Sequence, residues 1–159
     1  MARKGPSRIR AVTPDPIHRN QLVTKLINRC MKDGKKTVIQ KEVYRAFEII
    51  KEKSGENPIA VFETAMDNIR PTMEVRPRRV GGAAYQVPMS VRGPRKDSLA
   101  IRWLVGAARA RSSGEFHTFA EKLAVEILDS SKGEGVAVKK RQEIERVAEA
   151  NRAFAHFRW

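Results

Sequence analysis

The sequence contains a single cysteine, Cys30, and three histidines, His18, His117 and His156. One thiol cannot form an intramolecular disulfide or a cysteine-based zinc site, and this composition is typical of a reducing compartment. The histidines are far apart and share no motif, so we expect packed or surface residues rather than ligands. The sequence therefore predicts no metal site and no cofactor.

Long apolar runs are also missing. No run approaches the roughly 18 residues that a membrane-spanning helix needs, so we expect no membrane partner. The start of the chain, MARKGPSRIRAVTPDP, lacks the apolar stretch of a secretory signal. It is basic and contains proline, which predicts an extended basic arm over residues 1–17.

Catalytic motifs are absent as well. Gly34 and Lys35 begin a weak match to a phosphate-binding loop, but the glycine required five positions earlier is replaced by Arg29. No G-x-S-x-G, HExxH or dinucleotide fingerprint occurs, and the acids near the C-terminus alternate with Lys and Arg as on a solvated helix face. We therefore expect no catalytic residue, no small-molecule substrate and no enzymatic activity.

What the sequence has in excess is positive charge. It carries 32 Lys/Arg against 18 Asp/Glu in 159 residues, for a formal net charge of +14. Residues 1–36 and residues 70–111 each hold ten Lys/Arg and two acids, whereas residues 37–69 are slightly acidic and residues 112–159 are neutral. Charge needed only for solubility would not be segregated in this way, so we predict nucleic acid as the partner.

Hydrophobic residues at helical spacing predict a mainly α single domain of about six helices. The expected ranges are about 18–32, 38–54, 58–69, 98–111, 116–129 and 138–150. Thr37 with Gln40 has the spacing of a capping box, and Gly55 is expected to end the second helix. Asn57 and Pro58 predict an N-cap followed by proline in the first turn.

Between the third and fourth helices, two β-like runs flank Gly81 and Gly82, which predicts an antiparallel β-hairpin at about residues 72–91. Pro77 and Pro88 cannot donate to a strand ladder, but a two-stranded ribbon has only edge strands and tolerates them. We expect a helical domain over residues 18–150 that includes this hairpin, followed by an aromatic and basic tail over residues 151–159.

The arm, the hairpin and the helix after it are the candidate nucleic-acid contacts. In that helix, three arginines spaced by seven residues share nearly one stripe. Tyr85 is interpreted either as a stacking side chain or as packing against Val75 or Val87, and Trp103 keeps step with core residues. The residues expected to contact RNA are Arg3, Lys4, Arg8, Arg10, Lys35, Lys36, Arg76, Arg78, Arg79, Arg92, Arg95, Lys96, Arg102, Arg109 and Arg111.

A basic ribbon on a helical body also occurs in architectural DNA-binding proteins, which is the alternative function. Those ribbons insert an apolar side chain between base pairs. Here the tip is Gly81 and Gly82, which have nothing to insert. A small basic tip is better suited to a folded RNA, which is recognised by its shape and its phosphates.

Four strings of this sequence closely resemble small-subunit ribosomal protein seven of the bacterial and organellar type. They are DGKK at 33–36, IRPTMEVRPRRVGGAAYQVP at 69–88, LAIRWLVGAARAR at 99–111 and AEANRAFAHFRW at 148–159. The resemblance covers essentially the whole chain and implies six helices with a hairpin between the third and the fourth. It implies a structural constituent of the small ribosomal subunit, in the cytoplasm or in an organelle.

The resemblance further implies a primary binding protein for 16S-type rRNA that organises the 3′ major, or head, domain. Its implied neighbours are exit-site tRNA, the mRNA exit path and ribosomal proteins nine and eleven. The residues implied to lie near tRNA and mRNA are Arg79, Gly81, Gly82, Tyr85 and Arg141. Two positions depart from the family pattern, because Ala84 replaces a common hydroxyl residue and Glu145 replaces a common histidine.

Overall fold

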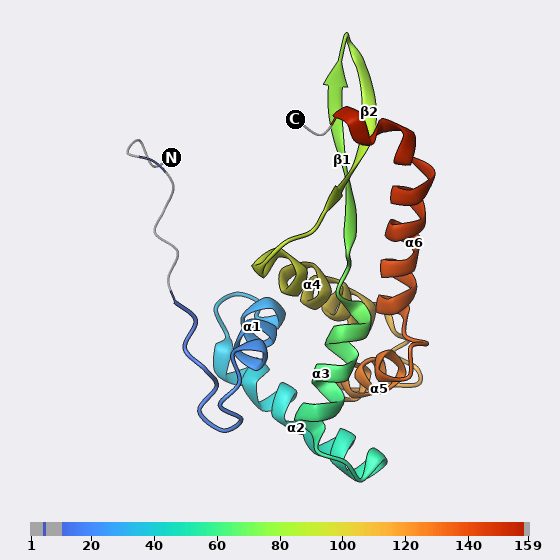
Figure 1. Cartoon of the computed structure of the whole chain (residues 1–159). Coiled ribbons are helices and arrows are strands. Elements are labelled where there is room, and N and C mark those ends of the chain that lie inside the picture. The colour runs from blue at the N-terminus through green and yellow to red at the C-terminus, as the bar shows by residue number, and fades with distance from the viewer. Residues whose placement is uncertain (1–4, 6–10, 158–159) are drawn as a thin grey trace.

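The computed structural model of the chain describes residue 5 and residues 11–157, where it contains six α-helices, one β-hairpin and one 3-10 helix (Figure 1). The predicted contacts Arg3, Lys4, Arg8 and Arg10 lie outside the described residues. The elements are α1 (Gln21–Cys30), α2 (Lys36–Ser54), α3 (Pro58–Ile69), β1 (Met73–Val80), β2 (Ala83–Ser90), α4 (Pro94–Ala110), α5 (Phe119–Ser131), α6 (Val136–Ala150) and η1 (Arg152–Phe157). The predicted mainly α fold, with the hairpin between the third and fourth helices, is confirmed.

The core lies where α5 packs against α2, α3 and α4. Each of these helices carries apolar residues on one stripe, and burying those stripes against one another is the main source of stability. Phe47, Phe62, Leu104 and Leu123 are among the fully buried side chains. Trp103 packs against the edge of this core, as predicted.

The ends of two helices follow local sequence signals. Asn57 accepts a hydrogen bond from the backbone N–H of Ile59 at 3.1 Å and so caps α3, as predicted. Gly55 ends α2 in the left-handed conformation with φ of 70°. Asn20 caps α1 through the N–H of Leu22, so this helix begins at residue 21 rather than 18.

The predicted capping box at Thr37 is wrong. Helix α2 begins at Lys36, its N-cap residue Lys35 makes no side-chain cap, and Gln40 donates instead to the Tyr44 hydroxyl at 2.6 Å. A capping box does occur at Thr118 and Glu121, so α5 begins at residue 119 rather than 116.

Helix α4 begins four residues earlier than predicted, at Pro94. Proline has no N–H to place in the helix ladder, but the first turn needs none, and its fixed φ suits that position. The preceding Gly93 has a φ of 57°, which lets the chain turn sharply out of the hairpin. The basic residues Arg95 and Lys96 therefore belong to the first turn of α4.

The hairpin stands out from the helical body, with α6 running beside it and η1 packed against β2 (Figure 1). Its strands are antiparallel, and Val80 faces Ala83 at the turn. Gly81 and Gly82 have φ of 57° and 88°, the positive values that a two-residue hairpin turn requires. The predicted glycine turn is confirmed.

The base of the hairpin is tied to α6. The backbone N–H and the hydroxyl of Thr72 both donate to Oε1 of Glu145, at 2.9 and 2.7 Å. Glu145 thus fixes the start of β1 against the helix. Val91, whose backbone N–H donates to the Thr72 carbonyl at 2.9 Å, is buried at the same junction.

Candidate nucleic-acid interface

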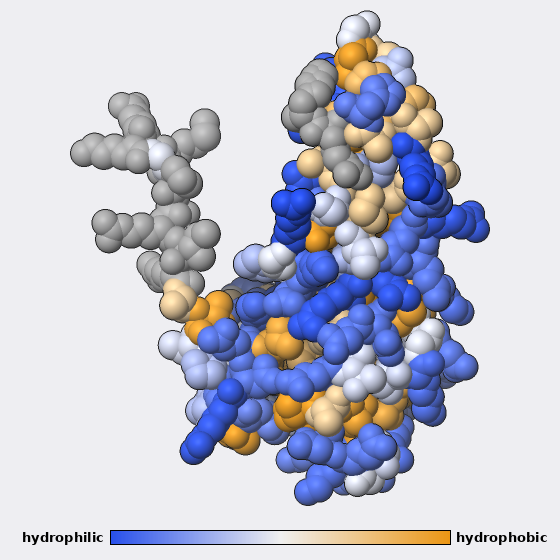
Figure 2. All heavy atoms as spheres, viewed as in Figure 1, coloured by the Kyte–Doolittle hydropathy of each residue, from blue (hydrophilic) through white to orange (hydrophobic). Residues whose placement is uncertain are grey.

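Most of the described residues predicted to contact RNA lie on the hairpin, on α4 and on the loop between α1 and α2. We call this surface the basic band. In Figure 2 the most hydrophilic residues gather where the hairpin meets the helical body. The members of the band are Arg76, Arg78, Arg79, Arg92, Arg95, Lys96, Arg102, Arg109, Lys32, Lys35 and Lys36, together with Lys25 and Arg29 of α1.

Glu74 orients two arginines at the base of the hairpin. The residue is only 7 % exposed, and its carboxylate accepts hydrogen bonds from Nε of Arg76 at 2.7 Å and from Nε of Arg95 at 2.8 Å. Burial opposes ionisation of Glu74, but the bonds from Arg95 and Arg76 outweigh it and lower the pKa of this carboxyl. Both arginine side chains remain about half exposed, at 49 % and 48 %, so they can also face a phosphate.

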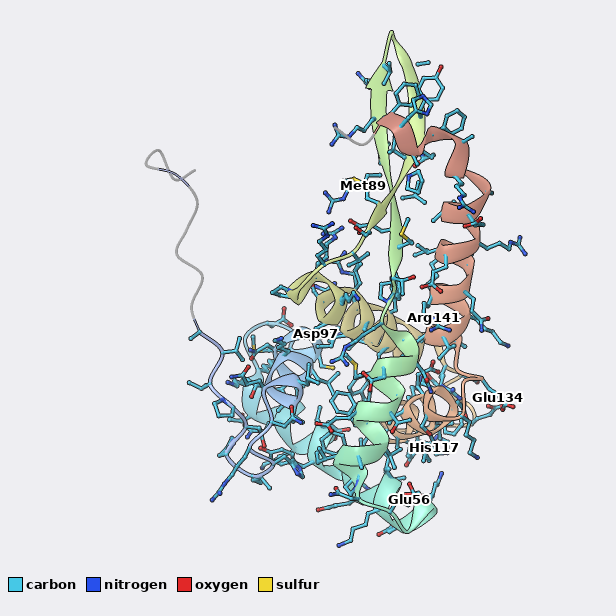
Figure 3. The ribbon with its side chains drawn as sticks, viewed as in Figure 1. Glu56, Met89, Asp97, His117, Glu134 and Arg141 are labelled. Carbon is cyan, nitrogen blue, oxygen red and sulfur yellow. The ribbon has the colours of Figure 1, made fainter. Side chains whose placement is uncertain are left out.

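Asp97 links the first turn of α4 to two other helices. It accepts from Lys25 of α1 at 3.0 Å and from Arg70, which follows α3, at 2.9 Å. Figure 3 shows Asp97 near the start of α4, beside α1. An acid in the first turn also suits the helix dipole. These contacts fix the angle at which the basic residues of α4 are presented.

A hollow of about 410 Å³ lies between α1 and α4. Lys25 and Arg29 line it from α1, and Pro94, Ser98 and Ile101 line it from α4. The sequence reasoning did not include Lys25, Arg29 and Lys32 among the contacts. Lys25 and Arg29 are four residues apart on the face of α1 opposite its apolar stripe, and Lys32 follows three residues later in the loop, which was the signal that could have identified them.

Arg109 forms the far end of the band, near the C-terminus of α4. One of its terminal nitrogens, Nη2, donates to the backbone carbonyl of Cys30 at 2.9 Å. Burial raises the pKa of the Cys30 thiol to about 12, although Arg109 and Arg29 act in the opposite direction. The thiol is therefore neutral and behaves as a small apolar group. Lys35 and Lys36 are exposed at the N-terminus of α2 nearby.

Arg111 has an intramolecular role that the sequence did not indicate. Its guanidinium bridges Glu126 at 2.6 Å and Asp129, both on α5. Burial disfavours the charged guanidinium, but the two carboxylates outweigh it and raise the pKa of Arg111. Glu126 is fully buried and also accepts from the N–H of Ala137 at 2.9 Å. Arg111 thus joins α4 to α5, and only 17 % of its side chain is exposed.

The residues expected near tRNA and mRNA are only partly brought together at the hairpin tip. Arg79, Gly81 and Gly82 are exposed at the tip. Tyr85 does not pack on the valines considered from the sequence: its ring lies against those of Phe154 and Phe157 in η1, at 5.2 and 5.3 Å. Figure 3 places Arg141 towards the body end of α6, away from the tip, where its Nε lies 3.7 Å from the Glu145 carboxylate.

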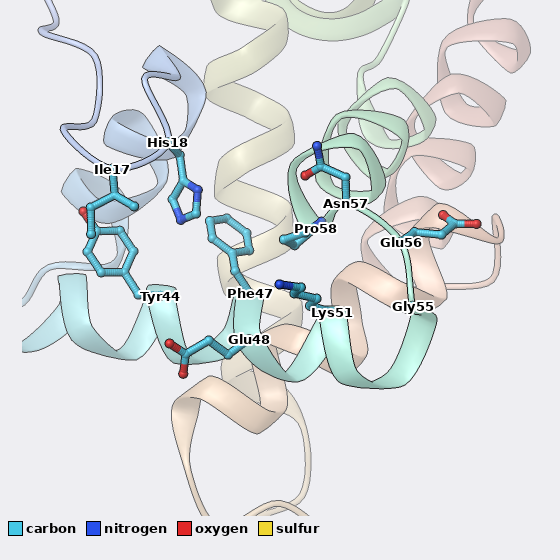
Figure 4. Close-up of a pocket in the computed structure, with 10 residues that line it drawn as sticks. All are labelled: Ile17, His18, Tyr44, Phe47, Glu48, Lys51, Gly55, Glu56, Asn57 and Pro58. Atoms are coloured by element: carbon cyan, nitrogen blue, oxygen red, sulfur yellow. The ribbon is translucent and has the colours of Figure 1, made fainter.

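The opposite end of the body has a different character. A hollow of about 550 Å³ lies at the corner between α2 and α3 (Figure 4) and is lined by Glu48, Lys51 and Glu56 among apolar and aromatic groups. His18 packs edge-on against Tyr44 there and serves as a packed residue. The positive charge of the band does not continue to this corner.

Neither a metal centre nor a membrane-crossing helix is found in residue 5 or residues 11–157. No three His, Cys, Asp or Glu side chains of this part lie close enough to hold a metal ion. No helix there is both long and apolar enough to cross a bilayer. A helical body with a projecting hairpin, and with exposed cations along the hairpin, α4 and the start of α2, is typical of nucleic-acid-binding proteins.

Comparison with known proteins identifies the family. The family model for ribosomal protein S7p/S5e matches residues 2–152. Small ribosomal subunit protein uS7 of Carboxydothermus hydrogenoformans is 57% identical over 159 residues, which is 100% of both chains. The proteins of the same name from Pseudothermotoga lettingae and Caldicellulosiruptor bescii are each 55% identical, over 99% and 100% of both chains. The chain belongs to the ribosomal protein S7p/S5e family, and its role is structural rather than enzymatic.

Proposed function

We propose that this protein is a primary binder of 16S-type rRNA and that it organises the 3′ major domain in the head of the small subunit. The observation that carries the proposal is the basic band, which runs from the hairpin along α4 to the N-terminus of α2. Relatives that match the whole chain are named as proteins of the small ribosomal subunit, which supports a ribosomal RNA as the ligand.

The mechanism of this proposal is the holding of several RNA segments in one geometry. Glu74 and Asp97 each bind two cations from different parts of the chain, and Glu126 binds Arg111, so the band is presented on a preorganised frame. When phosphates bind to such a frame, the protein loses little additional conformational entropy, and this favours one arrangement of the RNA. The helical core supplies the rigidity and the arginines supply the contacts.

The hairpin tip is proposed to lie near exit-site tRNA and the mRNA exit path, with ribosomal proteins nine and eleven as neighbours. The exposed Arg79, Gly81 and Gly82 support this placement, since they form a narrow projection that can enter a crowded RNA surface. The position of Arg141 on the lower part of α6 separates it from this group. Its proposed contact therefore belongs to another part of the surface.

Salt-dependent binding to an RNA fragment of the 3′ major domain tests the proposal. Because each neutralised phosphate releases counterions, log affinity should fall steeply and linearly with log salt. Replacing Arg92 and Arg102 together by alanine should reduce that slope by roughly two. Arg45 and Lys53, which are exposed on α2 away from the band, form the matched double-alanine control.

A flat salt dependence, or equal losses in the band and control variants, would contradict the proposal. Duplex DNA of equal length serves as competitor at the same salt concentration. Tighter binding to the duplex would favour the architectural DNA-binding alternative. Retained helix content by circular dichroism shows that a loss of affinity does not come from unfolding.

A further inference from the structure

A second kind of RNA contact is suggested by the hollow at the far end of the basic band. Its volume is about 270 Å³, and it lies between the end of α1, the start of α2, the end of α4 and the start of α5. It is lined by Cys30, Lys32, Lys35, Val38, Ile39, Arg109 and Phe119. We call it the α2 hollow. Its floor is apolar, its rim carries three cations, and no acidic residue lines it.

The cations are placed for a phosphate at the rim. The guanidinium of Arg109 is held in position by its bond to the Cys30 carbonyl. Lys32 and Lys35 precede the first turn of α2, which has no acidic residue and no side-chain cap. The Lys36 N–H donates to the Gly34 carbonyl at 2.8 Å, and the positive end of the helix dipole adds to the lysine charges.

The apolar part of the hollow requires a different group from a phosphate. Val38 is 56 % exposed beside the cationic rim, which makes it one of the few large apolar side chains left in solvent among the described residues. Ile39 and Phe119 are partly buried and pack against the core, so their exposed surfaces are fixed in place. The neutral thiol of Cys30 completes the floor.

We propose that the α2 hollow receives the base of one unpaired rRNA nucleotide while the cations on its rim bind the adjacent phosphates. This inference rests on the proposed rRNA function and adds a defined subsite to it. A nucleotide combines a flat, weakly polar base with a strongly anionic backbone, which matches an apolar floor beside three cations. Proteins bind unpaired bases by stacking them on aromatic rings and guanidinium planes, and Phe119 and Arg109 supply one of each.

Base-specific chemical probing of the rRNA fragment tests this subsite. The double variant Val38→Ser with Phe119→Leu removes apolar and aromatic surface from the hollow and leaves every cation. Its control is Val136→Ser on α6, where the valine is 52 % exposed and lies outside the hollow. We expect wild type and control to protect one base that the double variant leaves reactive, with unchanged backbone protection.

RNA with an abasic nucleotide at the protected position then measures how much this base contributes to binding by each protein. For the wild-type protein the abasic RNA should bind about tenfold more weakly, as expected for the loss of one stacked base. For the double variant the two RNAs should bind equally. The salt slope should be the same for both proteins, because no phosphate contact has been removed.

The base-binding subsite would be overturned if wild type and double variant protected the same bases, or if both lost the same affinity for the abasic RNA. Either result would leave the proposed rRNA binding intact. Absence of salt-dependent binding by the wild type would instead overturn the proposed function. If the double variant loses thermal stability, the single variant Val38→Ser is used for the test instead, because the exposed Val38 side chain contributes little to core packing. Loss of base protection in that single variant supports the subsite, and retention contradicts it.

Discussion

The ring of Tyr85 on β2 packs against the ring of Phe154 in η1, with their centroids 5.2 Å apart. Phe157 lies at a similar distance on the same 3-10 helix. An isolated two-stranded hairpin is at best marginally stable in water. The C-terminal segment therefore braces the outer half of the hairpin, while Thr72 and Glu145 hold its base.

Replacing Phe154 by alanine should loosen the outer hairpin without unfolding the body. An aromatic pair contributes about 0.5–1.5 kcal/mol beyond its buried area, and the helical core is remote from this contact. We expect faster amide hydrogen exchange across residues 79–86 and little change in the core helices. Tyr85→Phe should keep the brace, because the ring contact needs no hydroxyl.

The matched control for this brace is Arg152→Ala, since Arg152 lies on the same 3-10 helix with 80 % of its side chain exposed. That variant should exchange like the wild type. Unchanged exchange in the Phe154→Ala variant would show that the hairpin is rigid without the aromatic contact.

Glu74→Gln should weaken the junction between the hairpin and α4 in a pH-dependent way. The folded-state pKa of Glu74 is lower than its ordinary value of 4.5. The carboxylate therefore contributes its full stability above about pH 4.5, and this contribution disappears as the pH falls through the lower folded value. At pH 7 we expect a loss of about 1.5 kcal/mol, the lower end of the range for hydrogen bonds to a charged group, because both arginines are half exposed.

Urea unfolding between pH 7 and pH 3 measures this difference, which should shrink as the pH falls. The control is Glu143→Gln, because Glu143 pairs with Lys140 on α6 but its side chain is 59 % exposed. Exposed pairs contribute little, so the control should follow the wild type. A constant gap at all pH values would mean that Glu74 acts through packing rather than through its charge.

The order of the elements could be predicted from the sequence because it depends on local patterns. Apolar residues at helical spacing, the Asn57 cap and the two glycines of the turn each act within a few residues. The same locality explains the errors at helix ends. Threonine is common at N-caps, but Thr37 lies inside the helix, which begins at Lys36. Proline usually interrupts a helix, but Pro94 stands in the first turn, where it is tolerated.

The partners of the basic residues could not be predicted, because they come from distant parts of the chain. Arg95 meets Glu74 of the hairpin, and the ring of Tyr85 meets the C-terminal helix. Charge alone identified the basic surface but did not separate residues that face solvent from residues that bind a carboxylate. Arg111 was predicted to contact RNA for this reason, and its ion pairs emerge only when α4 and α5 are packed together.

Arg111→Ala should therefore act on stability, whereas Arg102→Ala should act on RNA binding. Removing Arg111 leaves the carboxylate of Glu126, which is fully buried, without its charged partner. Loss of one member of a buried ion pair typically costs about 3–5 kcal/mol. Arg102 is exposed on α4, the helix that ends just before Arg111, so its removal should leave stability unchanged and weaken rRNA binding.

Urea unfolding and rRNA affinity, measured on both variants at the same salt concentration, separate the two roles of these arginines. Arg111→Lys should restore only part of the stability, because one ammonium cannot reproduce the forked contacts to Glu126 and Asp129. Arg111 would be an RNA contact after all if its alanine variant unfolded like the wild type and bound rRNA as weakly as Arg102→Ala. The opposite result assigns Arg111 to the frame that holds α4 and its RNA-facing side chains in place.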